Sequence, residues 1–255
     1  MGSGRCGKGR HAPILLCVLD DRLALVASEP GLAALVLDVD GTLAPIVARP
    51  EDARVPDETR VELRRLVDRY ALVACLSGRA GSDARRVVRV DGITYVGSHG
   101  LELEPDAETW RGRMREFVAT VPWPVEDKGL TVSFHYRGMP DEKAARARLE
   151  ELAKQARAAG LRARFGRKVL ELRPPVEADK GTAIRRLVAG AGVSRALYAG
   201  DDTTDLDAFR GLREAGLDVA VCIAVESAEG PRELVEQADV VVNGTEGVLE
   251  ILRRL

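Results

Sequence analysis

Short apolar runs alternate with amphipathic stretches over most of the chain. Apolar runs of about four to eight residues bounded by glycine or polar turns are typical of strands buried on both faces of a parallel sheet. Stretches with apolar residues at helical spacing among charges predict surface helices. The predicted strands are 32–37, 71–76, 93–96, 196–199, 219–225 and 240–242, and the predicted helices are 56–70, 82–90, 180–189, 204–215 and 245–255. This alternation indicates βαβ units joined in a parallel sheet.

The middle of the chain follows a different pattern. The segments there are, in order, a helix at 108–121, an alternating strand at 129–137, a charged helix at 141–159 and short strands at 162–165 and 169–172. Helices and strands in this order predict a small α+β insert with a sheet of its own. We therefore expect an α/β protein, with a Rossmann-like parallel-sheet core and an inserted α+β cap domain.

Three regions are expected on this basis. Residues 1–31 form an N-terminal extension, made of a Gly-rich basic tail and a helix from Ile14 to Ala27 to which we assign no function. The core comprises residues 32–106 and, after the insert, residues 177–255. The cap domain between them comprises residues 107–176.

Composition and charge narrow the classes of function. Hydrophobic residues make up 45% and charged residues 31% of the 255 residues, which is typical of a globular protein. The 38 Lys and Arg and the 40 Asp and Glu leave a net charge of -2, so we expect no nucleic-acid partner. Cys6, Cys17, Cys75 and Cys222 are too scattered to predict a zinc site or a disulfide scaffold. No apolar run reaches the roughly 18–20 residues of a membrane span, so we expect a soluble, cytoplasmic protein. We also expect it to be a monomer.

Acidic residues gather after two of the predicted core strands. Asp38 and Asp40 follow the strand at 32–37, and Asp201, Asp202 and Asp205 follow the strand at 196–199. In open α/β sheets, ligands bind beyond the carboxyl ends of the strands. Asp202 is typical of a charge at a helix N-terminus, so we rank it below Asp201 as a ligand.

A hydroxyl and an ammonium group are expected at the same edge. Ser77 ends one predicted strand and Lys180 begins one predicted helix. Carboxylates crowded into a small space raise each other's pKa unless a cation neutralises them. Hard oxygen ligands suit Mg²⁺, which is typically shared with a substrate phosphate. The sequence therefore predicts a magnesium site that binds a phosphate ester.

Phosphate-ester hydrolysis through a carboxylate nucleophile follows from the same residues. The first Asp of the D-x-D sequence can attack phosphorus and form an aspartyl-phosphate. The second, Asp40, can protonate the leaving oxygen and then deprotonate the attacking water. Ser77 and Lys180 would bind the phosphoryl oxygens and offset the developing charge.

In these residues the chain resembles the haloacid dehalogenase-like phosphatase superfamily. Residues 38–43 (DVDGTL) look like its first motif, Ser77 like its second, Lys180 like its third and residues 200–205 (GDDTTD) like its fourth. All four motifs occur in the superfamily's order, and the resemblance covers residues 33–255.

The resemblance implies specific roles. Asp38 would be the nucleophile and Asp40 the general acid and base. Magnesium would be held by Asp38, by the main-chain carbonyl of Asp40 and by Asp201. Asp205 would support the ion through water or through the groups around it.

Further motifs are similar to those of the trehalose-6-phosphate phosphatase family. They are residues 76–79 (LSGR), 97–102 (GSHGLE), 126–129 (EDKG), 135–137 (HYR) and 166–174 (GRKVLELRP). In that family, cap residues contact glucose hydroxyls, and carboxylates and cations suit such contacts because hydroxyls both donate and accept hydrogen bonds. The resemblance implies substrate contacts at Glu126, Lys128, Arg137, Lys168 and Glu171, and at Arg79 and His99 in the core loops.

Other functions stay open at this point. The core motifs recognise only the phosphoryl group and cannot discriminate between sugars. Sucrose phosphate, glycosyl-phosphoglycerate and hexose phosphates are therefore alternative substrates. A non-catalytic sugar-phosphate sensor and a phosphomutase are further alternatives. For His99 and His135, a structural role stands beside a role in substrate binding.

Overall fold

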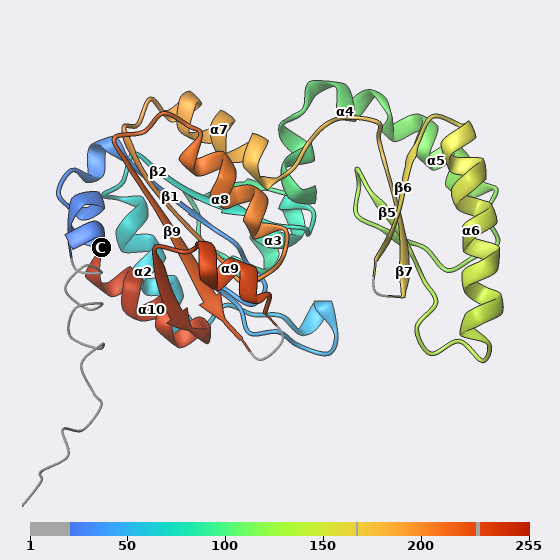
Figure 1. Cartoon of the computed structure of the whole chain (residues 1–255), viewed down its shortest axis with the longest axis horizontal. Helices are drawn as coiled ribbons and strands as arrows, with labels where there is room; N and C mark the ends of the chain where they lie inside the picture. The colour runs from blue at the N-terminus through green and yellow to red at the C-terminus, as the bar shows by residue number, and fades with distance from the viewer. Residues whose placement is uncertain (1–20, 167, 228–229) are drawn as a thin grey trace, which may run out of the picture.

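The computed structural model describes residues 21–166, 168–227 and 230–255. Figure 1 shows a larger body built on a wide parallel sheet and, beside it, a smaller body built on an antiparallel sheet. The chain enters the smaller body after the third core strand and returns to the larger one at helix α7. The α/β class with an inserted α+β unit is thus confirmed.

The large sheet has six strands, all paired in parallel, in the order β10-β9-β8-β1-β2-β3. The strands are β1 (Ala33–Leu37), β2 (Leu72–Leu76), β3 (Thr94–Val96), β8 (Arg195–Gly200), β9 (Val219–Glu226) and β10 (Val240–Asn243). Along β1, Leu35 and Leu37 join one hydrophobic cluster, and Ala34 and Val36 join the cluster on the other face. Burial on both faces explains why this strand is apolar at every position.

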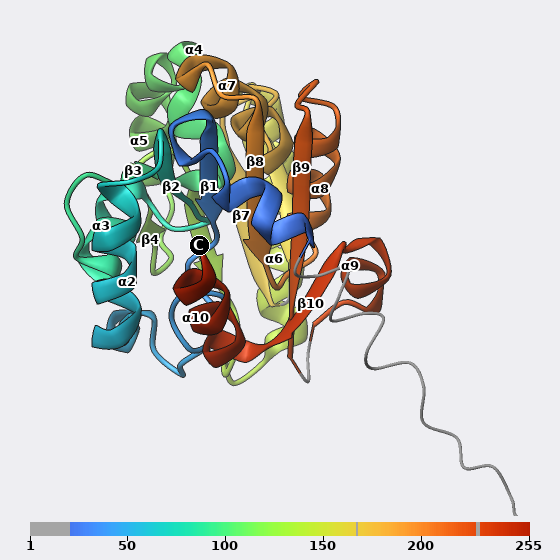
Figure 2. The ribbon, with the colours of Figure 1, turned by 90° about the vertical axis from the view of Figure 1, so that its left-hand side faces the viewer.

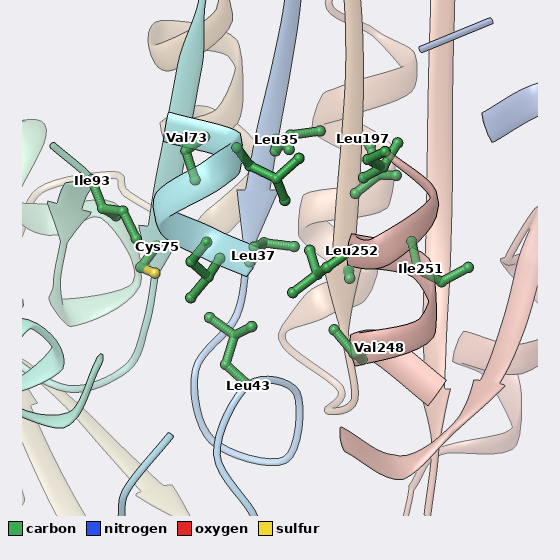
Figure 3. Packing of buried hydrophobic residues seen from close by; sticks show 14 of the residues in the cluster. Leu35, Leu37, Leu43, Val73, Cys75, Ile93, Leu197, Val248, Ile251 and Leu252 are labelled. Carbon is green, nitrogen blue, oxygen red and sulfur yellow. The ribbon is translucent and has the colours of Figure 1, made fainter. Parts of the chain in front are cut away.

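Helices cover both faces of this sheet (Figure 2). One face packs against α2 (Asp57–Val67), α3 (Gly81–Val88), α10 (Gly244–Arg254) and a helical segment at residues 21–27. Figure 3 shows side chains of β1, β2, β8 and α10 that meet in this cluster. The other face packs against α7 (Lys180–Ala191), α8 (Asp205–Arg213) and α9 (Arg232–Gln237). Of the helix predicted from Ile14 to Ala27, the part before residue 21 lies outside the described residues.

The smaller sheet has the strand order β4-β5-β7-β6 and is antiparallel throughout. Its elements are α4 (Pro105–Thr109), α5 (Arg111–Ala119), β4 (Glu126–Asp127), β5 (Val132–His135), α6 (Glu142–Ala158), β6 (Arg162–Gly166) and β7 (Val169–Arg173). Val132, Phe134, Leu170 and Leu172 pack on α5 and α6 in a core of their own. The opposite face of the sheet is turned toward the larger body (Figure 1). Within the described ranges, no helix has both the length and the apolar composition to cross a membrane.

Several element boundaries differ from the sequence prediction. The helix predicted at 108–121 is two helices, α4 and α5, which meet at Trp110. The first of them begins at Pro105, a residue favoured in the first helical turn because its missing N–H needs no partner there. Helix α10 begins at Gly244, one residue before the predicted start at 245. The short elements β4 and α9 were not predicted, because two and six residues carry little periodic signal.

Helices α7 and α8 cross with their backbones in contact. A Cβ atom on Gly211 would lie 2.4 Å from the Cα and carbonyl oxygen of Gly181. A Cβ atom on Gly181 would lie 2.4 Å from the carbonyl oxygen of Asp207. Because neither glycine carries a side chain, the N-terminal turns of both helices reach the same edge of the sheet.

We expect Gly211→Ala to lower the free energy of unfolding by about 1–3 kcal/mol, because the added methyl group overpacks the α7–α8 contact. Gly190→Ala, near the end of α7, is the matched control. A Cβ there meets no described atom within 4 Å, so alanine should raise stability by about 0.5–1 kcal/mol. Urea unfolding of the two variants measures both changes. Equal effects of the two substitutions would contradict the close crossing.

Candidate active site

The polar residues predicted from the sequence meet at the carboxyl ends of three neighbouring strands. Asp38 follows β1, Ser77 follows β2 and Asp201 follows β8. Lys180 and Asp205 are the first residues of α7 and α8. All five side chains are buried, although polar groups are rarely buried without strong partners.

Lys180 joins two of the carboxylates. Its Nζ atom donates to Asp38 Oδ1 at 2.7 Å and to Asp205 Oδ1 at 2.6 Å. The start of α7 is fixed by a capping box, in which the side chains of Asp179 and Thr182 bond each other's backbone N–H groups. Burial by itself would lower the pKa of Lys180, but the two carboxylates outweigh it and raise the pKa above its ordinary value. The ammonium group therefore stays charged in the interior.

Three carboxylates lie together around this lysine. Asp38, Asp201 and Asp205 each offer an oxygen, and these atoms lie within 4.8 Å of one another. Burial raises the pKa of Asp38 to about 7, although Lys180 opposes the shift. Burial and the charges of Asp38 and Asp205 raise the pKa of Asp201 to about 8. Such shifts mark carboxylates that lack sufficient positive charge nearby.

The donor set fits a divalent cation. Asp201 Oδ1 is buried and has no hydrogen-bond partner among the described residues. Gly41 makes room for this carboxylate, because a Cβ there would lie 2.0 Å from Asp201 Oδ2. Hard carboxylate oxygens with a free lone pair are the ligands that such cations prefer. The cluster is therefore a candidate divalent-metal site.

Asp40 lies at the wall of the site with its side chain turned to Arg79. Arg79 donates from Nε to Asp40 Oδ2 at 2.6 Å and from Nη2 to Asp40 Oδ1 at 2.7 Å. The same guanidinium contacts Asp83 Oδ2 at 2.7 Å and the carbonyl oxygen of Pro50 at 3.0 Å. Arg79, which the resemblance implied as a substrate contact, is thus already engaged by three groups of the chain. Its guanidinium holds both oxygens of the Asp40 carboxylate while it also lines the cavity described below.

His99 is presented by a loop with unusual backbone angles. Ser98 and His99 both have positive φ values, 52° and 55°, which are uncommon for residues other than glycine. Their N–H groups donate to the carbonyl oxygens of Arg79 and Ser77. The imidazole packs on Gly78, where a Cβ would lie 2.7 Å from the ring. Burial, with help from nearby cations, lowers the pKa of His99 to about 3, so the ring is neutral at physiological pH.

A cavity of about 990 Å³ lies in front of these groups. Its core wall includes Asp38, Asp40, Ser77, Arg79, His99, Lys180 and Asp201. Its other wall belongs to the smaller body and includes Arg111, Glu126 and Lys128. The volume is at the upper end of the range of about 300–1,000 Å³ that is usual for small-molecule sites.

The remaining predicted cap residues lie at different places. Glu126, Ser133 and Glu171 face each other in register across β4, β5 and β7, on the side opposite the cap core. Glu171 is therefore on the same face as Glu126, although it does not line the cavity within the described residues. Arg137 follows β5 and is exposed, and Lys168 forms an ion pair with Glu142 at 2.7 Å.

Three residues of the site carried no sequence signal. Arg111 lines the cavity from α5 and pairs with Glu108. Asp83 accepts a hydrogen bond from Arg79, and Tyr198 donates from its hydroxyl to Asp205 Oδ1 at 2.6 Å. None of them belongs to a motif quoted above. The apolar run at 196–199 predicts that Tyr198 is a buried strand residue, but its hydrogen-bond partner depends on the position of α8.

Solved structures match the fold. A structure described as a trehalose-6-phosphate phosphatase related protein is 27% identical, with a TM-score of 0.65, and the match covers 86% of this chain and 95% of that one. A haloacid dehalogenase-like hydrolase from Bacteroides thetaiotaomicron has a TM-score of 0.59 at 16% identity, over 87% of this chain and 98% of that one. The second match shows that the chain has a haloacid dehalogenase-like fold.

Sequence comparison shows which family the chain belongs to. The family model for trehalose-phosphatase matches residues 36–124 and 113–238. The trehalose-phosphate phosphatase of Mycobacterium avium (strain 104) is 36% identical over 243 residues, which cover 84% of this chain and 61% of that protein. The chain belongs to the trehalose-phosphatase family. It spans about three fifths of the length of the curated relatives it matches first.

We expect a divalent cation to raise Tm more at pH 8 than at pH 5.5. The pKa values of Asp38 and Asp201 are raised from 3.8 to about 7 and about 8 in the folded protein. The metal-free folded state therefore binds more protons than the unfolded state between pH 4 and 8, and its stability falls as pH rises through that window. Bound metal requires both groups ionised and removes this loss.

Thermal unfolding of chelator-treated protein, with and without added MgCl₂ or MnCl₂, measures the effect. Asp201→Asn should lose most of the gain in Tm, and it should be relatively more stable than the metal-free wild type at the higher pH. The same gain in Asp201→Asn as in the wild type would rule out metal binding at this cluster.

Proposed function

We propose that the chain is a Mg²⁺-dependent phosphatase that hydrolyses trehalose 6-phosphate to trehalose and phosphate through an aspartyl-phosphate on Asp38. The single observation that carries this proposal is the cavity, which has Asp38 and Lys180 at one end and Glu126 and Lys128 of the cap at the other. One end suits a phosphoryl group and the other suits sugar hydroxyls. The relative from Mycobacterium avium bears the corresponding name.

In the first step, a carboxylate oxygen of Asp38 attacks phosphorus, and the bond from phosphorus to the sugar oxygen breaks. Asp40 donates a proton to that leaving oxygen. Both oxygens of Asp40 are held by Arg79, so this step requires that one of these contacts is exchanged for the substrate. Lys180 and Ser77 bind the phosphoryl oxygens and offset their charge.

In the second step, Asp40 takes a proton from a water molecule that attacks the aspartyl-phosphate. The acyl phosphate breaks at its phosphorus–oxygen bond, which releases phosphate and restores the Asp38 carboxylate. Magnesium, held by Asp38, Asp201 and the main-chain carbonyl of Asp40, would neutralise phosphoryl charge in both steps. Asp205 would support it indirectly, because this carboxylate already accepts from three donors.

The proposal also covers the domain boundaries, the oligomeric state and the cellular location. The core comprises residues 32–106 and 177–255, and the cap comprises 107–176, whose hydrophobic cluster is separate from those of the large sheet. Core and cap residues of the same chain line the cavity, so the proposed mechanism needs no residue from a second copy. The described thiols of Cys75 and Cys222 are free, which suits the reducing cytoplasm.

Asp38→Asn tests the nucleophile. We expect kcat to fall by at least about 1,000-fold, because the amide cannot form the covalent intermediate. Phosphate release from trehalose 6-phosphate measures the change, and a cooperative thermal unfolding transition would show that the variant is folded. Wild-type turnover by this variant would refute the assignment of Asp38.

Glu126→Ala and Glu171→Ala test the cap. We expect KM for trehalose 6-phosphate to rise by about 10-fold or more, since each lost charged hydrogen bond is worth about 1.5–3 kcal/mol. Turnover of p-nitrophenyl phosphate, which lacks the sugar, should be unchanged. Glu151→Ala, on the exposed side of α6 where it pairs with Lys154, is the matched control.

The same assay over a panel of esters tests the substrate. Sucrose phosphate, glycosyl-phosphoglycerate and hexose phosphates should be poorer substrates than trehalose 6-phosphate. Preference for a monosaccharide phosphate would overturn the assignment of the sugar while leaving the chemistry in place. Transfer of phosphate to another carbon, or binding without release, would replace the phosphatase by a phosphomutase or a sensor.

A further inference from the structure

Tyr198 is a buried titratable residue that the mechanism above does not use. It lies on β8, and its relative exposure is 0%. Its ring packs edge-on against Phe209 of α8, with the ring centroids 6.2 Å apart. Its hydroxyl donates to Asp205 Oδ1 at 2.6 Å. This side chain therefore does more than fill the core, because its polar end reaches the acidic cluster.

Asp205 receives hydrogen bonds from three separate parts of the chain. Tyr198 of β8 and Lys180 of α7 both donate to Oδ1, and the backbone N–H of Asp202 donates to Oδ2 at 2.8 Å. The carboxylate packs directly on the strand, since a Cβ on Gly200 would lie 2.3 Å from its Cγ atom. At 0% exposure, it is closed to bulk water. Loss of the Tyr198 hydroxyl would leave Oδ1 with the hydrogen bond from Lys180, and solvent could not readily replace the one that is lost.

The ammonium of Lys180 is shared between Asp205 and Asp38. Each carboxylate attracts it, and the balance depends on how much positive partial charge each receives from elsewhere. The phenolic O–H supplies such charge to the very oxygen of Asp205 that contacts the lysine. It thereby weakens the hold of Asp205 on Lys180.

We propose that Tyr198 is a positioning residue, whose hydroxyl holds Asp205 so that Lys180 remains shared with Asp38 and the phosphoryl group. Without the hydroxyl, Lys180 moves toward Asp205 and away from the reacting atoms. The inference rests on the proposed phosphatase chemistry, and it deepens it. Because it concerns the phosphoryl end of the cavity, every phosphate monoester should be affected alike.

Tyr198→Phe removes the hydroxyl and keeps the ring. We expect kcat to fall by about 10- to 100-fold on both trehalose 6-phosphate and p-nitrophenyl phosphate, which is the usual range for a hydrogen bond to a charged group. KM for trehalose 6-phosphate should stay within about twofold, because the cap is unchanged. A purely structural role would not produce this split between kcat and KM.

Two further variants distinguish the effect of the Tyr198 hydroxyl on kcat from the effect of ring packing. Phe209→Leu disturbs the same aromatic contact without touching Asp205, so it should lower Tm while kcat stays near the wild-type value. In an Asp205→Asn background, Tyr198→Phe should have little further effect on kcat, because the two residues act through one contact.

Three results would overturn the inference. They are wild-type kcat in Tyr198→Phe, an equal loss in Phe209→Leu, and a full additional loss in the Asp205→Asn background. A wild-type protein that hydrolyses p-nitrophenyl phosphate but not trehalose 6-phosphate would refute the proposed substrate alone, and the p-nitrophenyl phosphate arm would then decide the role of Tyr198. Hydrolysis of neither ester would overturn both.

Discussion

The ammonium of Lys180, buried between Asp38 and Asp205, is the interaction on which the rest of the site depends. Breaking a buried ion pair by removing one partner is strongly destabilising, because the other charge is left uncompensated. Here the lysine compensates two carboxylates at once, and Asp201 adds a third within 4.8 Å. The cluster thus carries excess negative charge, which the packed core must hold in place and which attracts cations. A bound divalent cation would in turn attract a phosphoryl group.

Rigid packing makes such a cluster possible. Asp38 extends from β1, which has hydrogen-bonded neighbours on both sides and apolar clusters on both faces. Where polar groups need to approach closely, the chain has glycine. Gly41 admits the carboxylate of Asp201, and Gly181 and Gly211 admit the backbones of α7 and α8. A side chain at any of these three positions would prevent the close contact there. The contacts that glycine allows hold the carboxylates in place against their mutual repulsion.

The polar residues at the carboxyl edge of the large sheet were predictable, because each follows a recognisable strand or begins a predicted helix. The carboxyl ends of the strands in a parallel sheet share one edge. Their partners were not. That Arg79 holds both oxygens of Asp40, or that Tyr198 reaches Asp205, depends on contacts between distant elements. The cap shows the same limit. Its residues could be named by resemblance, but the cross-strand register that aligns Glu126 with Glu171 is a property of the folded sheet.

The two ends of the cavity differ in how their residues depend on one another. At the core end, one continuous network of short contacts in the interior joins Asp38, Lys180, Asp205 and Tyr198. At the cap end, Glu126 contacts His135 at 2.7 Å in a more exposed setting. Coupled residues give non-additive effects, whereas separate exposed sites add. Under the proposed function, substitutions in the cap would therefore change which sugar is bound while the chemistry at Asp38 stays intact.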